Sequence, residues 1–161
     1  MLPASKHIAK MPNPNILKDI GADKIVDGDL ELNVVRMIEV INMRIEYLYD
    51  RDHTIGHAYF TSLRGNEATI HKLASIFKKS IIPLLQEYFY EDYSKIRMIL
   101  GDNGKDNPNH MFIREIKSEP NNDFRGNTSD LDIPEYYYQI NDKAFDNIMS
   151  YIEIIGKKSG D

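Results

Sequence analysis

The sequence predicts a mainly α-helical domain of about five or six helices, with a small two-stranded β element near its C-terminal end. Three observations support this prediction. Several segments repeat apolar residues every three to four positions, capping residues precede these segments, and only two short segments are rich in β-branched and aromatic residues. The chain of 161 residues is long enough for one domain with a substantial core. We divide it into a connector (1–29), a helical domain (30–155) and a disordered tail (156–161).

The composition narrows the class of protein. A hydrophobic share of 42% and a charged share of 28% are typical of a globular chain. The chain has no cysteine, no apolar run long enough for a membrane span and no signal-peptide core near its N-terminus, so we expect a cytoplasmic protein without a membrane partner. The formal net charge of -5 argues against tight, sequence-independent binding of nucleic acid by the domain as a whole, although it leaves room for a local basic patch.

The first long helix should begin after Asn33, a good N-cap residue. Its apolar face is formed by residues spaced three or four apart, namely Val34, Met37, Ile38, Ile41, Ile45 and Leu48. Residues 51–55 must leave the helix, and Gly56 suits a backbone that needs a positive φ or a close approach. From His57 a second, shorter helix is expected to run to about Leu63.

The next helices follow from capping residues and one proline. Asn66 can cap a third helix that runs through Lys79. Because proline is tolerated only in the first turn of a helix or at a kink, Pro83 allows either a new helix starting near Ser80 or one long, kinked helix. A further short helix should begin after Asp92 and end at Gly101.

The C-terminal part combines strands and one helix. Residues 111–116 and 136–140 have strand composition, and we expect them to pair across a long polar loop. Residues 102–109 form a second polar loop. Asn141 or Asp142 can cap a final helix that runs to about Ile155.

His53 and His57 are four residues apart, a spacing that on a helix would suit a zinc ion. The metalloprotease pattern requires Glu directly after the first histidine, where this chain has Thr54, and Gly56 favours a turn over a helix. We therefore predict no metal site. The two histidines are expected to hydrogen-bond to neighbouring carboxylates or to the backbone and so to fix the turn.

Residues 42–60 carry the densest pattern of the chain. They read NMRIEYLYDRDHTIGHAYF, with five charged residues and two histidines among large apolar side chains. This segment resembles the pattern Asn-x-Arg-Ile-x-x-Leu-x-Asp/Glu-Arg-Asp/Glu-His-x-Ile-Gly-His-x-Tyr-Phe of the McrB family. These are AAA+ GTPases, the motor subunits of restriction systems that cut DNA carrying modified cytosine. Residues 81–90 (IIPLLQEYFY) resemble a second signature of the family, 137–145 a weaker third one, and 11–17 the connector after its large nucleotide-binding subdomain.

The resemblance implies a C-terminal helical lid that covers a nucleotide. Ile55, Gly56 and His57 would form the lid turn nearest the phosphates, with His57 at a helix N-terminus where anions are favoured. The other polar residues of the two signatures would form one structural cluster that fixes this turn, comprising Asn42, Arg44, Asp50, Arg51, Asp52, His53, Gln86 and Glu87. Within this cluster, residues 50–52 either pair among themselves or contact a neighbouring subunit, and residues 86–87 are expected to bond Arg44 or His53.

The chain lacks the parts that hydrolyse a nucleotide. It has no P-loop, no Walker B strand and no arginine finger, so we expect no catalytic residues and no enzymatic activity from this chain alone. GTP with Mg²⁺ is expected only together with the missing nucleotide-binding subdomain. The implied partners are this AAA+ large subdomain, neighbouring ring subunits and a nuclease subunit, with DNA bound only through the full complex. The alternative is a stand-alone helical interaction module, or a truncated remnant, that binds no nucleotide. A metal-dependent hydrolase centred on the two histidines is the least favoured hypothesis.

Overall fold

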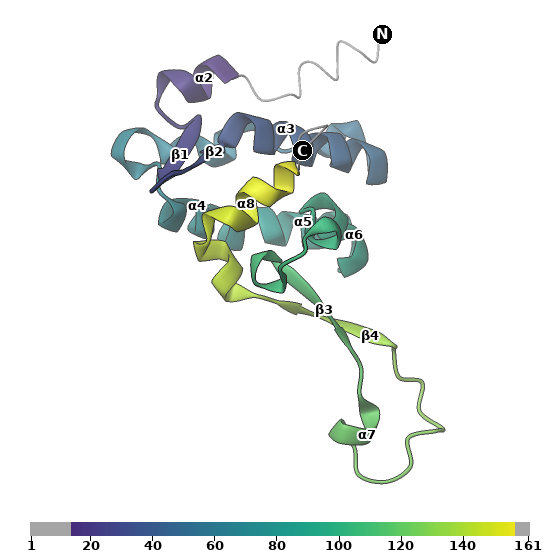
Figure 1. Ribbon diagram of the computed structural model, residues 1–161. Helices are drawn as coiled ribbons and strands as arrows, with labels where there is room; N and C mark the ends of the chain where they lie inside the picture. Colours follow the sequence, from purple (N-terminus) through teal and green to yellow (C-terminus); the bar gives the residue numbers. More distant parts are fainter. Residues whose placement is uncertain (1–13, 157–161) are drawn as a thin grey trace.

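The computed structural model describes residues 14–156, which form a helical body with a projecting β arm (Figure 1). The α-helices are α2 (Pro14–Asp19), α3 (Val34–Leu48), α4 (Ile70–Ile76), α5 (Ile82–Tyr88), α6 (Tyr93–Ile99), α7 (Pro120–Asp123) and α8 (Ile148–Ile155). The strands are β1 (Lys24–Asp27), β2 (Leu30–Asn33), β3 (Ile113–Lys117) and β4 (Tyr136–Ile140). The predicted fold class is confirmed. Residues 1–13 and 157–161, which hold the first three positions of the 11–17 motif and most of the predicted tail, lie outside the described residues.

Helix α3 is the longest uninterrupted α-helix among these residues and organises the body. It begins as predicted, because the Asn33 side chain accepts a hydrogen bond from the backbone N–H of Arg36 at 3.0 Å. Its buried face packs against α8 and α6. None of the helices within residues 14–156 is long and apolar enough to cross a membrane.

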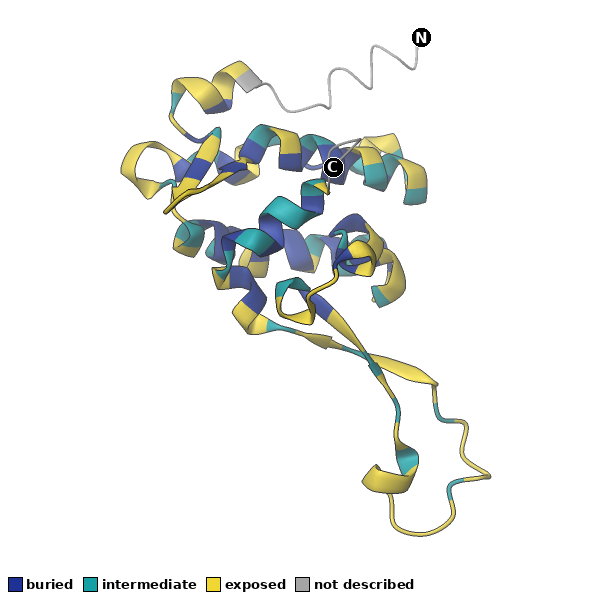
Figure 2. Ribbon diagram, viewed as in Figure 1, coloured by how far each residue is buried: buried dark blue, intermediate teal, exposed yellow. Residues whose placement is uncertain are grey.

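The core lies between α3, α8 and the helical stretch that runs from α4 to α5 (Figure 2). Aromatic rings fill its centre. Phe77 stacks on Phe112 with ring centroids 5.7 Å apart, and Tyr151 meets Phe77 edge-on at 4.9 Å. Because these three residues come from widely separated parts of the chain, the ring contacts tie α8 to both the α4–α5 stretch and the start of β3.

The stretch from Ile70 to Tyr88 is one continuous helix with a wide π turn in its middle. In the π turn, residues 77–81, the backbone N–H of Ile82 bonds to the carbonyl of Phe77, five residues back. Of the two alternatives that Pro83 allowed, the structure therefore has the single interrupted helix, and Pro83 lies in the first turn of α5. The predicted cap at Asn66 is wrong. Thr69 caps α4, because its hydroxyl accepts from the N–H of Lys72 at 3.1 Å.

Two predicted helices differ in type or length. Residues 57–63 form a 3-10 helix where a short helix was expected. The last predicted helix is split into a 3-10 segment, residues 142–146, and α8. The predicted cap at residue 141 or 142 is wrong for α8, because the Asn147 side chain caps it by accepting from the N–H of Met149 at 3.0 Å.

A β-hairpin lies where only a connector was expected. Strands β1 and β2 pair antiparallel across a turn at Gly28, where φ is +62°. Ile25 and Leu32 face each other across the pair and are both buried. Each strand has four residues, too few for an alternating pattern to emerge in the sequence. The hairpin crosses the predicted boundary at residue 29 and packs with the body.

The predicted pairing near the C-terminal end is confirmed. Strands β3 and β4 are antiparallel, with Ile113 opposite Ile140 and Lys117 opposite Tyr136. We call residues 113–140 the arm. It leaves the body at the buried Ile113 and carries α7 beyond the strands, and most of its length is exposed (Figure 2).

Candidate functional site

The predicted lid turn is tied to the middle of α3 by one buried amide. Asn42 is fully buried, and its side chain donates to the carbonyl of Ile55 at 2.9 Å and accepts from the N–H of Ile55 at 2.6 Å. A neutral amide thus satisfies both backbone groups of a single residue. The Ile55 side chain is also buried, so the start of the 55–57 turn has a fixed position.

Neither the backbone conformation nor the packing around residue 56 requires a glycine. Its φ of -85° and ψ of 164° lie in the extended region that any residue can adopt. A Cβ placed on Gly56 would have no atom within 4 Å. The expectation that the backbone requires glycine here, through a positive φ or a close approach within the chain, is therefore wrong. Space next to this residue is open on the side where a side chain would project.

His57 begins the 3-10 helix of residues 57–63 and is partly exposed. Among the hydrogen bonds of residues 14–156, none involves its imidazole ring, so the ring is available to a group outside this part of the chain. The helix that His57 begins has seven residues and is 3-10 in type, so its dipole attracts an anion less strongly than that of the α-helix expected from the sequence.

His53 and Asp50 form the polar pair that the sequence led us to expect. The Nδ1 atom of His53 lies 2.6 Å from Oδ1 of Asp50, and both side chains are 43% exposed. The hydrogen bond from His53 is the main cause that lowers the pKa of Asp50. The imidazole also packs against Tyr49 and Tyr88, with ring centroids 4.7 and 5.1 Å away. The side chains of the intervening residues, Arg51 and Asp52, are exposed.

The other predicted members of the cluster lie elsewhere. Arg44 points toward the end of α6, where its Nη1 donates to the carbonyl of Ile99 at 3.1 Å. Residues 42 and 44 are separated by about 200° around a helix, so their side chains leave α3 in different directions. Gln86 donates to the hydroxyl of Tyr93 at 3.3 Å, not to Arg44 or His53, and Glu87 is exposed. Asn42, the Asp50–His53 pair, Arg44 and Gln86 therefore have separate partners in the structure.

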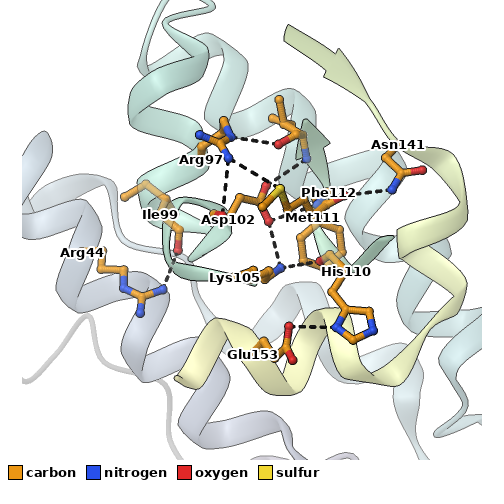
Figure 3. Close-up of polar contacts among 11 residues, drawn as sticks. Arg44, Arg97, Ile99, Asp102, Lys105, His110, Met111, Phe112, Asn141 and Glu153 are labelled. Atoms are coloured by element: carbon orange, nitrogen blue, oxygen red, sulfur yellow. Dashed lines mark hydrogen bonds and ion pairs between the residues drawn. The ribbon is translucent and has the colours of Figure 1, made fainter. Parts of the chain in front are cut away.

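A second polar centre, which we call the Asp102 cluster, was not anticipated from the sequence (Figure 3). Asp102 and Lys105 are almost completely buried, with Nζ of Lys105 2.8 Å from Oδ1 of Asp102. The two carboxylate oxygens also accept from the backbone N–H groups of Phe112 and Ile113 at 3.0 and 2.9 Å. Arg97 completes the cluster by donating from Nε to the carbonyl of Ile113 at 2.9 Å.

The electrostatics of the Asp102 cluster indicate a structural role. Burial raises the pKa of Asp102 and lowers the pKa of Lys105, and the attraction between the two charges opposes both shifts. Lys105 also donates to the carbonyl of His110 at 2.7 Å and lies 4.3 Å over the ring of Phe112. All donors and acceptors face one another inside the fold, so this cluster fixes the loop between α6 and β3. The only signal in the sequence was Asp and Lys three residues apart, which is common in exposed loops.

The described part of the chain contains no cluster of side chains that could serve as metal ligands. Among residues 14–156, no three His, Asp or Glu side chains lie close enough together to hold a metal ion. His53 is engaged by Asp50 and the aromatic rings, and His57 begins a separate helix. That the protein binds no metal stays a prediction.

These features define a helical domain that has a surface turn fixed from within by a buried amide. Residues 33–97 match the family model described as the McrB α-helical lid domain. The match begins at the cap of α3, includes Asn42 and the 55–57 turn, and ends within α6. This segment is therefore similar to the McrB lid domain. The arm and α8 lie beyond the matched residues. No curated protein matched the chain.

Proposed function

We propose that the protein is the C-terminal lid portion of a McrB-like AAA+ GTPase in a cytoplasmic, modification-dependent DNA restriction system. In this proposal the lid closes over GTP and Mg²⁺ held by a large nucleotide-binding subdomain. It also contributes to assembly of the ring and, through the ring, to contact with a nuclease subunit and DNA. The lid match at residues 33–97 supports the family, and the open turn at Gly56 supports the site.

The single observation that carries the proposal is the empty space beside Gly56. Neither backbone geometry nor packing within residues 14–156 requires a glycine at this position. A missing side chain next to a partly exposed imidazole leaves room for another molecule to approach the backbone closely. His57 then lies where its ring can donate to a phosphate oxygen, and Asn42 holds the turn in place from the core.

Ring assembly is assigned to the exposed charges that precede the turn. Arg51 and Asp52 project from a short 3-10 segment, residues 51–53, between α3 and the turn. Exposed charges contribute little to the stability of a folded chain, and they serve readily as contacts between subunits. Contact between these residues and a neighbouring subunit would couple the position of the lid to the ring.

The proposal is tested by joining the nucleotide-binding subdomain of a McrB-type GTPase to the N-terminal end of the chain. The joined protein should hydrolyse GTP, whereas the chain alone should not. Gly56→Leu and His57→Ala should each lower the rate at least about tenfold with unchanged melting temperature. The leucine fills the open space beside the turn, and the alanine removes the imidazole that would donate to the phosphate. Ala58→Leu is the matched control, since residue 58 is exposed and adds the same bulk one position beyond His57.

Two outcomes would contradict the proposal. GTP hydrolysis that is unaffected by both Gly56→Leu and His57→Ala would place the turn away from the nucleotide. Hydrolysis by the joined protein that is no faster than that of the nucleotide-binding subdomain alone would favour the alternative of a helical interaction module without a role in nucleotide binding.

A further inference from the structure

A groove of about 350 Å³ lies between α3, the end of α6 and α8, and it belongs to neither the 55–57 turn nor the Asp102 cluster. We call it the Arg44 groove. Its lining residues are Arg44, Tyr47, Leu48, Met98, Gly101, Asn103, Gly104 and Glu153. A groove of this volume accommodates one or two side chains of a ligand. Its walls combine apolar side chains with one cation, Arg44, and one carboxylate, Glu153.

The guanidinium of Arg44 makes few contacts with the rest of the described chain. Arg44 is partly buried, and its single hydrogen bond there runs from Nη1 to the carbonyl of Ile99 at 3.1 Å. No carboxylate among residues 14–156 lies within ion-pair distance of it. A guanidinium carries five N–H donors in a rigid fork, so several remain for a ligand. Burial lowers the pKa of Arg44, which reflects the cost of holding this charge without a partner.

Gly101 makes the position of the guanidinium possible. The backbone of Gly101 is left-handed, with φ at +75°. A Cβ on this residue would lie 3.1 Å from the carbonyl oxygen of Glu153 and 3.3 Å from Nη1 of Arg44. The absence of a side chain therefore lets Arg44 lie against the loop and lets its fork face the groove.

Two of the apolar side chains that line the groove are exposed to solvent. Tyr47 is 83% exposed and Met98 is 43% exposed, and Leu48, which also lines the groove, is partly buried against the core. Large apolar side chains that line a groove next to an unpaired cation are typical of a binding surface. The remaining charge at the groove, Glu153, is directed to His110, with Oε1 2.9 Å from Nδ1 of the imidazole (Figure 3).

We propose that the Arg44 groove binds a segment of a partner protein that presents an apolar side chain directly followed by Glu or Asp. The apolar side chain packs among Tyr47, Leu48 and Met98, and the carboxylate accepts from the free N–H groups of Arg44. Glu153 at the rim favours this singly charged acid over a phosphate, because a multiply charged anion is repelled more strongly. The inference is independent of the proposed role of the 55–57 turn.

The test is a titration of the ¹⁵N-labelled chain with the peptide acetyl-Phe-Leu-Glu-amide, followed by NMR. Backbone amides of residues 44–48 and 98–104 should shift, with a dissociation constant in the range of about 1 mM, which is ordinary for a contact of this size. The matched peptide acetyl-Phe-Leu-Gln-amide has the same shape without the charge and should bind about tenfold more weakly. Acetate alone should leave these amides unchanged.

Variants separate binding from folding. Tyr47→Ala should weaken the peptide at least about fivefold with an unchanged melting temperature, because Tyr47 is almost fully exposed. Arg44→Lys keeps the charge but loses the fork and should abolish most of the preference for Glu over Gln. Met43→Ala, exposed on the same helix but outside the groove, should bind like the wild type. Equal binding of the Glu and Gln peptides, equal shifts with acetate, or no shifts at about 10 mM peptide would overturn the proposal.

Discussion

Asn42 and Asp102 are both fully buried, and each binds the backbone of a segment that follows a helix. Asn42 uses a neutral amide that donates and accepts, so it satisfies Ile55 without any further partner. Asp102 is an anion that can only accept, so it needs two backbone N–H groups and Lys105 together. Holding a segment with a charge thus requires a network, whereas holding it with an amide requires one residue.

This difference affects how firmly each segment is held. The 55–57 turn is attached at one residue and remains partly open to solvent, whereas the loop between α6 and β3 is attached through residues 102, 105, 110, 112 and 113. Segments with few buried contacts open locally at lower free energy. We therefore expect the 55–57 turn to open more readily than the loop that supports the start of the arm.

The largest expected effect is that of Asp102→Ala. Removing the carboxylate leaves the ammonium of Lys105 and two N–H groups buried without their acceptor, so the free energy of unfolding should fall by about 3–5 kcal/mol. Urea denaturation measures this loss, with Asp106→Ala at an exposed neighbouring position as the control. A loss no larger than that of Asn42→Ala would contradict the distinction between a charged and a neutral anchor.

Asn42→Ala should destabilise the chain less, by about 1–3 kcal/mol, because water can reach the partly exposed turn once the amide is gone. The exchange of the Ile55 amide proton should accelerate more than that of amides in the core of α3. Met43→Ala is the matched control on the exposed side of the same helix. Unchanged exchange at Ile55 would mean that the turn is held by other contacts.

Tyr151→Phe should cost about 1 kcal/mol near neutral pH, because the hydroxyl donates to the carbonyl of Phe145 at 2.7 Å. Burial raises the pKa of Tyr151 in the folded chain above the ordinary value near 10. The contribution of the Tyr151 hydroxyl to the free energy of unfolding is therefore fully present below about pH 10. As the pH rises further, this contribution falls by about 1.4 kcal/mol per pH unit. The variant lacks this loss, so its deficit should shrink between about pH 10 and 11.5. If the free energies of unfolding of the two proteins ran parallel with pH, folding would not raise the pKa of Tyr151.

His53→Ala should have the smallest effect on folding, below about 0.5 kcal/mol, because both members of the pair with Asp50 are exposed. The pKa of Asp50 should rise in this variant, since the hydrogen bond from His53 is what lowers it most. A depressed carboxylate pKa stabilises the fold above the unfolded-state value, so any difference between variant and wild type should vanish in acid. Carboxyl NMR titration measures the pKa directly. A large loss of stability would restore a single structural cluster around the turn.

The sequence predicted a role for Asn42 in fixing the turn, but it did not predict which residues share this role. The start of α3 was predicted from its cap and its apolar periodicity, whereas the turn after α3 was predicted because polar and apolar residues are densely mixed in residues 42–60. The assignment of Arg44, Gln86 and Glu87 to the same cluster failed because a signature names residues without giving their directions. The spacing of Asp102 and Lys105 was too common a signal to predict their burial, since an acidic residue in a polar loop is expected to be exposed until the packing around it is known.

By itself the sequence determined the helical class, the start of α3 after Asn33, the pairing of β3 with β4 and the similarity of residues 33–97 to the McrB lid domain. These features depend on residues that are near one another in the chain or on a signature read directly from it. The tertiary structure decided which polar groups meet, because the deciding bonds join residues far apart: 13 positions for Asn42 and Ile55, 43 for His110 and Glu153, and 55 for Arg44 and Ile99. Periodicity specifies which face of a helix is buried, but only the packed chain determines what that face and its neighbours leave unpaired at the surface.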